Sequence, residues 1–119
     1  MDERILTVGS SINNKIKYIR SAVSNRGQLE MLAEECAELQ QACLKSIRMR
    51  SDDTYPLDEN KYTADQVNQN LHDEMMDVAV SLLIVLGSKE TAYSRVFQNE
   101  REIDQRLVKM CDRIRLFDV

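Results

Sequence analysis

The sequence predicts an all-α protein, built as a single four-helix domain over residues 1–119. The chain of 119 residues contains only 3 glycines and 1 proline, which are too few breakers for a sheet with many turns. Its apolar residues recur every three or four positions over long stretches, as they do on one face of a helix. A hydrophobic content of 43% with 30% charged residues is typical of helices packed on one core and argues against disorder.

The first two predicted helices lie in the N-terminal half. Ser10 or Ser11 is the candidate N-cap of a helix that ends near Val23. A turn is predicted over residues 24–27, and a second helix over residues 28–49. The apolar stripe of this second helix is formed by Leu32, Cys36, Leu39, Cys43 and Ile47.

The C-terminal half predicts a polar loop and two further helices. Residues 50–62 contain the only proline and form the expected loop. Thr63 and Gln66 have the spacing of a capping box, which marks the start of a third helix, and Gly87 is a suitable C-terminal cap. A fourth helix is expected to continue to about Leu116, with an interruption near residues 98–101.

Composition restricts the class of function. The formal net charge of -4 disfavours a nucleic-acid partner, because proteins that bind nucleic acid usually carry a basic surface. Cys36, Cys43 and Cys111 lack metal-finger spacing, so we expect free, buried thiols in a reducing cytoplasm. The longest apolar run, residues 78–86, is too short to cross a bilayer, and the N-terminus lacks a secretory signal. We therefore expect a soluble, cytoplasmic protein without a membrane partner.

The third predicted helix is apolar on nearly all sides between residues 78 and 86. A monomer with only four helices does not easily bury such a helix, whereas a second chain would cover it. We therefore expect a homo-oligomer, most simply a dimer that completes the bundle.

A short acidic pattern occurs twice, in residues 32–39 and 71–78. Each copy reads apolar, any, acid, acid, apolar, small or apolar, acid, apolar. At about 100° per residue, Glu35 and Glu38 lie about 60° and 120° to one side of their apolar stripe, and Glu74 and Asp77 lie likewise. Antiparallel packing of the two helices would bring these four carboxylates together. The small residues Ala42 and Ser81 are expected to leave room beside them for a ligand.

Four carboxylates in one place are the ligands that Mg²⁺, or alternatively Mn²⁺, prefers. Neither acidic pair has a Lys or Arg four residues later, although exposed helices commonly pair their acids in this way. The alternative interpretation is an unrelated helical interaction protein whose acids are ordinary solvated surface. The single histidine, His72, is expected to be a surface residue.

The two motifs, LAEECAEL and DEMMDV, resemble the EExxE…ExxD arrangement of the MazG-like all-α nucleoside triphosphate pyrophosphohydrolases over roughly residues 26–110. The resemblance implies an oligomeric, Mg²⁺-dependent house-cleaning enzyme that cleaves a nucleotide between its α- and β-phosphates. It implies that Glu35, Glu38, Glu74 and Asp77 are the metal ligands. Glu34 is then the candidate to orient or deprotonate the attacking water.

The resemblance also implies that basic or polar residues of the last helix contact the phosphates. Asn99 and Arg101 are the candidates, with Arg95 and Lys109 as rivals, and Tyr18, Tyr55 and Tyr62 are available to stack on a base. The chain departs from the family pattern in the 35 residues, 39–73, that separate its acidic pairs, which is longer than usual. A catalytically inactive MazG-like nucleotide-binding or regulatory module is therefore the alternative function.

Overall fold

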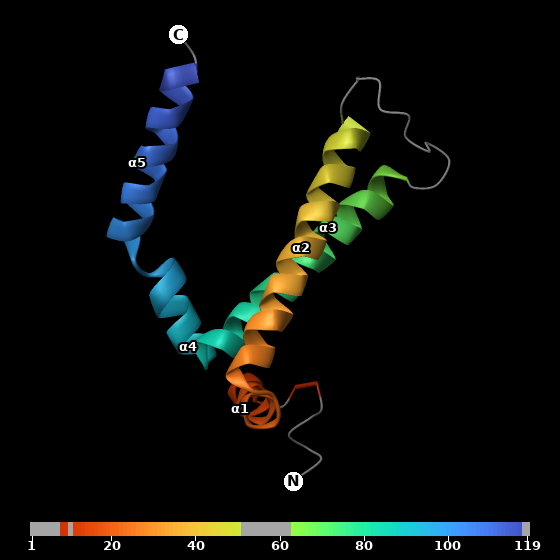
Figure 1. The fold of residues 1–119 in the computed structure, drawn as a ribbon, viewed down its shortest axis with the longest axis vertical. Helices are drawn as coiled ribbons and strands as arrows, with labels where there is room; N and C mark the ends of the chain where they lie inside the picture. Colours follow the sequence, from red (N-terminus) through yellow and green to blue (C-terminus); the bar gives the residue numbers. More distant parts are fainter. Residues whose placement is uncertain (1–7, 10, 51–62, 118–119) are drawn as a thin grey trace.

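The computed structural model describes residues 8–9, 11–50 and 63–117, and every regular element in these ranges is a helix (Figure 1). The prediction of an all-α chain is confirmed. The elements are α1 (Ile12–Ala22), α2 (Asn25–Arg50), α3 (Ala64–Leu86), α4 (Lys89–Ala92), the π-helical turn η2 (Tyr93–Phe97) and α5 (Glu100–Phe117). The expected loop, with Tyr55 and Tyr62, lies outside the described residues except for Arg50, which ends α2.

Local hydrogen bonds explain where α1 and α3 begin and end. The Ser11 hydroxyl accepts a hydrogen bond from the Asn14 amide at 3.3 Å and so caps α1. At the start of α3 the Gln66 amide donates to the Thr63 hydroxyl at 3.1 Å, and the Thr63 amide donates to the Gln66 side chain at 2.9 Å. Gly87 ends α3 with a φ of 99°, a left-handed conformation that favours glycine. These three predicted caps are confirmed.

The start of α2 differs from the prediction, because residues 25–27 are the first turn of the helix and not a connecting turn. The Ser24 hydroxyl accepts a hydrogen bond from the Gly27 amide at 3.1 Å, which is the bond of an N-cap. A Cβ atom at position 27 would lie 2.8 Å from Val23 Cγ1. Glycine therefore permits the sharp change of direction from α1 to α2.

The core of the fold is the antiparallel pair of α2 and α3, which pack along one another (Figure 1). Their contact positions recur at intervals of four and three, the spacing of helices that pack at a shallow angle. On α2 the buried or half-buried positions of this seam are Gln28, Leu32, Glu35, Leu39, Ala42 and Ser46, and on α3 they are Val67, Leu71, Glu74, Val78, Ser81 and Val85. The seam thus contains an acidic residue from each helix.

The prediction of buried cysteines is wrong for the chain by itself. Cys36, Cys43 and Cys111 are free, as expected, but all three are exposed. The seam of α2 passes through Glu35 and Ala42, so the neighbouring cysteines are turned about 100° away from α3. The small side chains on the seam allow the two helices to approach closely on this face.

Helix α1 crosses one end of the α2–α3 pair and is tied to it by polar side chains. The Arg20 guanidinium donates hydrogen bonds to the carbonyls of Ile84 at 2.6 Å and Val85 at 3.0 Å, and to the Gln28 side chain at 3.3 Å. A cation at the C-terminal end of α3 also interacts favourably with the helix dipole. Arg20 therefore connects α1, α2 and α3 at one point.

We expect Arg20→Met to lower the free energy of unfolding by about 2 kcal/mol, because it removes charge-assisted hydrogen bonds to the last turn of α3. Urea denaturation followed by circular dichroism measures this change. Lys17→Met on the exposed part of the same helix is the matched control, with an expected change within about 0.5 kcal/mol. Equal destabilisation by the two variants would contradict the role of Arg20 as a connection between helices.

The expected fourth helix is divided, as predicted, near residues 98–101. The π-helical turn η2 ends where the Gln98 amide donates to the Tyr93 carbonyl at 3.0 Å. The Asn99 side chain then accepts a hydrogen bond from the Glu102 amide at 3.3 Å and caps α5. Because α5 rises away from α2 and α3 (Figure 1), one chain does not close the expected four-helix bundle.

None of the helices in the described ranges combines the length and the apolar character needed to cross a membrane.

Candidate metal centre

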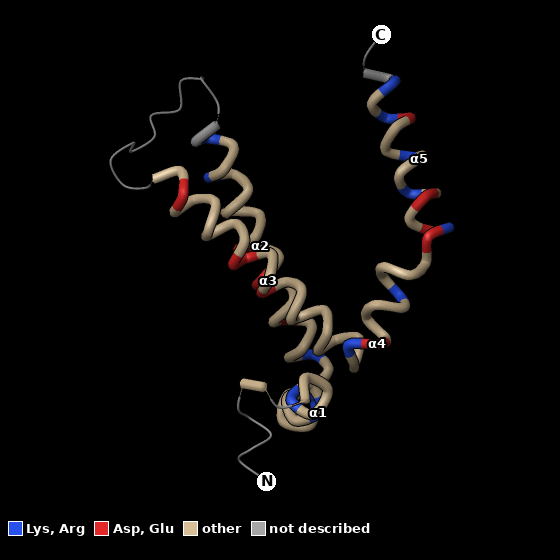
Figure 2. The backbone as a smooth tube through the Cα atoms, turned by 180° about the vertical axis from the view of Figure 1, so that it is seen from behind, with Lys and Arg blue, Asp and Glu red and all other residues tan. Residues whose placement is uncertain are grey.

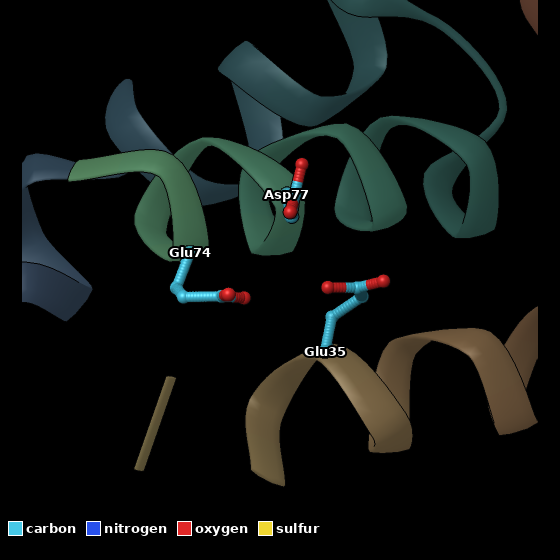
Figure 3. Close-up of side chains that lie close together, drawn as sticks. All are labelled: Glu35, Glu74 and Asp77. Carbon is cyan, nitrogen blue, oxygen red and sulfur yellow. The ribbon is translucent and has the colours of Figure 1, made fainter. Parts of the chain in front are cut away.

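Acidic side chains from α2 and α3 meet in the middle of the helix pair. Figure 3 shows Glu35 of α2 facing Glu74 and Asp77 of α3, and one carboxylate oxygen of each lies within 4.8 Å of the others. Glu38 lies beside this group, because its negative charge raises the pKa of both Glu35 and Glu74. The structure therefore brings together all four acids of the two sequence motifs. We call them the carboxylate cluster.

The carboxylate cluster lies partly on the seam itself, whereas the sequence predicted that all four acids lie to one side of it. Glu35 and Glu74 are half-buried seam positions, whereas Glu38 and Asp77 are exposed one turn further along their helices. Glu35 lies opposite Glu74 across the seam. In the antiparallel register the neighbouring opposed pairs are half-buried and apolar, namely Leu32 with Val78 and Leu39 with Leu71. Two carboxylates therefore lie between apolar layers, where charge is expensive unless it is compensated.

The cluster contains two acceptor atoms that nothing in the described chain satisfies. Oε2 of Glu35 and Oε2 of Glu74 are both out of contact with solvent, and neither has a hydrogen-bond partner. Buried carboxylate oxygens are normally hydrogen-bonded or bound to a metal ion. These two atoms come from different helices, and a positive group bound between α2 and α3 would satisfy both.

The electrostatics of the cluster follow from this geometry. Desolvation raises the pKa of Glu35 and of Glu74 above the ordinary value of 4.5, and the negative charges of Glu38 and Asp77 raise them further. Carboxylates so close together repel one another when all of them are charged. A bound cation would relieve this repulsion and stabilise all four carboxylates in their charged form.

The raised pKa values predict how the stability of the metal-free protein depends on pH. Since the folded state holds protons on Glu35 and Glu74 more tightly than the unfolded state does, the free energy of unfolding falls as pH rises above 4.5. The free energy of unfolding stops falling once the pH exceeds the raised pKa values of these two glutamates. We expect the thermal midpoint in EDTA to be higher at pH 5 than at pH 7.5.

The control for this pH dependence is the double variant Glu35→Gln/Glu74→Gln, whose midpoint should change much less between these two pH values. Glu90 does not interfere with this comparison. The hydrogen bond from Asn13 lowers the pKa of Glu90, so the stability that its charged carboxylate contributes is lost only below pH 5. A midpoint that rises from pH 5 to pH 7.5 in the native protein would show that the cluster does not govern stability there.

The donor set of the cluster fits Mg²⁺. Octahedral Mg²⁺ binds oxygen at about 2.1 Å, so its ligands lie at most about 4.2 Å apart. Small rotations of the side chains would bring the present separations, within 4.8 Å, to that range. Glu35, Glu38, Glu74 and Asp77 could hold the ion together with water or a phosphate oxygen. The exposed positions of Glu38 and Asp77 place the open side of the centre toward solvent.

Glu34 is exposed and lies outside the cluster, one turn before Glu38 on the same flank of α2. Ala42 and Ser81 lie one turn beyond Glu38 and Asp77, toward opposite ends of the pair. They are only 1% and 5% exposed, so they are covered and do not leave open space beside the carboxylates as expected. Their small side chains serve close helix packing instead. Tyr18 lies exposed on α1.

The candidate phosphate-binding residues lie elsewhere in the chain. Arg95, Asn99, Arg101 and Lys109 are all exposed on η2, on α5 or at their junction. An open hollow of about 440 Å³ beside α5 is lined by Asn99, Arg101, Glu102, Gln105, Arg106 and Lys109. Among the described residues, no Lys or Arg is a main cause of the pKa shifts of Glu35 or Glu74. Within one chain, the structure does not bring these residues to the cluster.

One further acid of the centre had no role in the sequence interpretation. The negative charge of Asp73 contributes to the raised pKa of Glu74. Its carboxylate accepts a hydrogen bond from the Gln69 side chain at 2.8 Å, which fixes it one turn before Asp77. Asp73 is the first acid of the second motif and matches Glu34 in the first. The repeated pattern could therefore have identified Asp73 as a candidate residue.

Comparisons with known proteins identify no family, because no family model, no curated protein and no solved structure matches the chain significantly. The two acidic motifs, and the geometry that brings them together, are therefore the features of this chain that bear on its function.

Proposed function

We propose that this protein is a Mg²⁺-dependent pyrophosphohydrolase of the MazG-like type. In this proposal it hydrolyses nucleoside or deoxynucleoside triphosphates to a monophosphate and pyrophosphate. The observation that carries the proposal is the convergence of two separate acidic motifs, one on α2 and one on α3, with a buried, unsatisfied oxygen on each helix. Acids that only solvate a surface have no reason to face one another across a helix seam.

The chemistry of such a centre is charge compensation. Four carboxylates by themselves would repel a triphosphate. Glu35, Glu38, Glu74 and Asp77 would hold a Mg²⁺ ion on the helix pair, and the ion would supply the positive charge that the phosphate oxygens need. In the reaction, water forms a bond to the α-phosphorus, the bond to the bridging oxygen breaks, and pyrophosphate leaves.

A general base is the second requirement. Glu34 is one turn from Glu38 on the exposed flank, so its carboxylate can accept the proton of a water that approaches from solvent. Asp73 occupies the equivalent position on α3, but it is engaged by Gln69. We assign Glu34 the role of base and Asp73 a supporting electrostatic role.

The proposal includes a homo-oligomer that works in the cytoplasm, as a dimer or a tetramer. Large apolar side chains remain exposed on both helices of the pair. They include Leu29 and Ile47 on α2 and Met75, Met76 and Val80 on α3. Exposed apolar surface of this extent on a helix pair supports contact with another subunit.

The decisive experiment is pyrophosphate release from a panel of NTPs and dNTPs, with Mg²⁺ and with EDTA. Mg²⁺-dependent release together with a monophosphate product supports the proposal and begins to identify the substrate. Release of orthophosphate, or turnover that EDTA does not affect, would contradict it. Mg²⁺ binding without turnover would instead indicate the inactive nucleotide-binding module.

A further inference from the structure

The two helices of the core pair repeat one another along the whole seam. The seam positions of α2 and of α3 correspond one to one at a constant separation of 39 residues, from Gln28 and Val67 at one end to Ser46 and Val85 at the other. Within each matched pair the burial is the same, except that Ser46 is buried and Val85 is half-buried. Because the helices are antiparallel and Glu35 lies opposite Glu74, an approximate twofold axis between these two carboxylates relates the matched positions.

The same axis relates the remaining acids of the centre. Figure 2 shows acidic positions of both helices gathered midway along the α2–α3 pair. Glu38 corresponds to Asp77, and Glu34 corresponds to Asp73, again at a separation of 39 residues. By position alone, Glu34 and Asp73 would therefore have the same relation to an ion bound on the axis. The side chains beside these two acids, however, are different.

Asp73 is held by a neighbouring side chain, whereas Glu34 is not. The side-chain amide of Gln69 donates a hydrogen bond to Oδ1 of Asp73 at 2.8 Å. The position on α2 that corresponds to Gln69 is Glu30, whose carboxylate has no proton to donate and accepts a hydrogen bond from Arg26 at 2.9 Å. Within the described ranges, no other residue forms a hydrogen bond with the side chain of Glu34.

The charges of the two matched acids also act differently on the centre. Desolvation is the largest cause of the raised pKa of Glu74, and the negative charge of Asp73 adds to it. Glu34 is not among the main causes of the raised pKa of Glu35. Since the effect of a charge grows as the distance falls, the carboxylate of Asp73 lies closer to the centre than that of Glu34. The hydrogen bond from Gln69 therefore breaks the approximate symmetry of the site.

We propose that Asp73 is a positioning residue of the metal centre, which Gln69 fixes where its carboxylate accepts a hydrogen bond from a water molecule bound to Mg²⁺. Mg²⁺ usually keeps several waters in a protein site. A carboxylate that accepts a hydrogen bond from such a water orients it and strengthens metal binding. This inference rests on the proposed function, which assigns Mg²⁺ to the carboxylate cluster. The matched acids then differ in role, because Asp73 supports the ion while Glu34 stays free to accept a proton.

The first test compares the two matched acids. Asp73→Asn and Glu34→Gln each replace one exposed carboxylate by an amide, so they change the net charge equally. We expect isothermal titration calorimetry with Mg²⁺ to show that Asp73→Asn weakens binding about tenfold, whereas Glu34→Gln changes the dissociation constant less than about twofold. Circular dichroism checks that both variants remain helical. Equal weakening by the two variants, or unchanged binding by Asp73→Asn, would overturn the proposal.

The second test isolates the hydrogen bond. Gln69→Leu leaves the charge of Asp73 in place and removes only the group that orients it. We expect this change to weaken Mg²⁺ binding about threefold in the native protein and less than about 1.5-fold in the Asp73→Asn background, because the two residues act as one unit. An equal effect in both backgrounds would show that Gln69 does not act through Asp73.

The matched control for Gln69→Leu is Gln40→Leu. Gln40 is also exposed, but it lies on α2 at about 140° from Glu35, on the side of the helix turned away from the cluster. Its replacement by Leu should leave Mg²⁺ binding within about 1.5-fold in both backgrounds. A loss of affinity as large as that of Gln69→Leu would show that the effect comes from the added apolar side chain, and would overturn the role of Gln69.

Both tests are made without nucleotide, so they are independent of turnover. A protein that shows the expected difference between Asp73→Asn and Glu34→Gln, but releases no pyrophosphate, would contradict the proposed function alone. A protein that releases pyrophosphate with Mg²⁺, but binds the ion equally well in Asp73→Asn, would overturn this inference alone. A native protein that binds no Mg²⁺ would overturn both.

Discussion

Replacing Glu38 by Gln is expected to reduce Mg²⁺-dependent pyrophosphate release by at least about a hundredfold while the helices remain folded. The amide keeps the size of the side chain but removes the negative charge that would hold the metal ion on the exposed side of the centre. Asp77→Asn on the facing helix should have an effect of the same order. The loss should appear mainly in kcat, because the metal stabilises charge that develops in the transition state.

The matched control is Glu30→Gln on the same helix. Glu30 is exposed and pairs with Arg26 at 2.9 Å, away from the cluster, so its replacement should leave the rate within about twofold. Glu34→Gln tests the proposed base separately, because it should lower turnover without lowering Mg²⁺ affinity. Retention of full activity by both Glu38→Gln and Asp77→Asn would show that these residues are not ligands of the catalytic metal.

Adding Mg²⁺ to the metal-free protein is expected to raise its thermal midpoint. An ion that binds only the folded state adds about 2.7 kcal/mol at a concentration one hundred times its dissociation constant. It would also satisfy the buried oxygens of Glu35 and Glu74, which have no partner in the described chain. Differential scanning calorimetry with EDTA and with increasing Mg²⁺ measures the shift, and Ca²⁺ tests how selective the centre is.

The variants Glu35→Gln and Glu74→Gln should separate stability from metal binding. Because both carboxylates are desolvated beside other negative charges, a neutral amide should raise the midpoint of the metal-free protein at pH 7.5 by several degrees. The same variants should lose the response to Mg²⁺. Such a result is the behaviour expected of a site that sacrifices stability for function. A native protein that Mg²⁺ leaves unchanged would indicate that the acids are only surface charge.

The helix ends show how far local sequence information reaches. Ser11, the Thr63–Gln66 capping box and Gly87 were predictable because each is satisfied by hydrogen bonds to residues at most four positions away. The start of α2 was missed by three residues. Ser24 is also a local cap, but the sequence SNRG has the composition of a turn, and the close approach of Val23 to position 27 could not be read from that composition.

The candidate site, too, could be predicted from the sequence only in part. The residue types and their spacing predicted four carboxylates that face one another. The rotation of α2 about its axis was not predictable, because it depends on which face α3 contacts. The apolar stripe through Cys36 and Cys43 competes with the seam through Glu35 and Ala42, and the small seam residues allow the closer approach. As a result the cysteines are exposed and two glutamates are half-buried.

The sequence by itself therefore determined the helical class, most helix ends and the identity of the acidic residues, since these depend on periodicity and on short-range hydrogen bonds. Only the tertiary structure decided that Glu35 and Glu74 lie between apolar layers with unsatisfied oxygens, and that α5 stands apart from the helix pair. Burial and the relative placement of helices depend on contacts between residues far apart in the chain. Such contacts leave no signature in the local pattern of either partner.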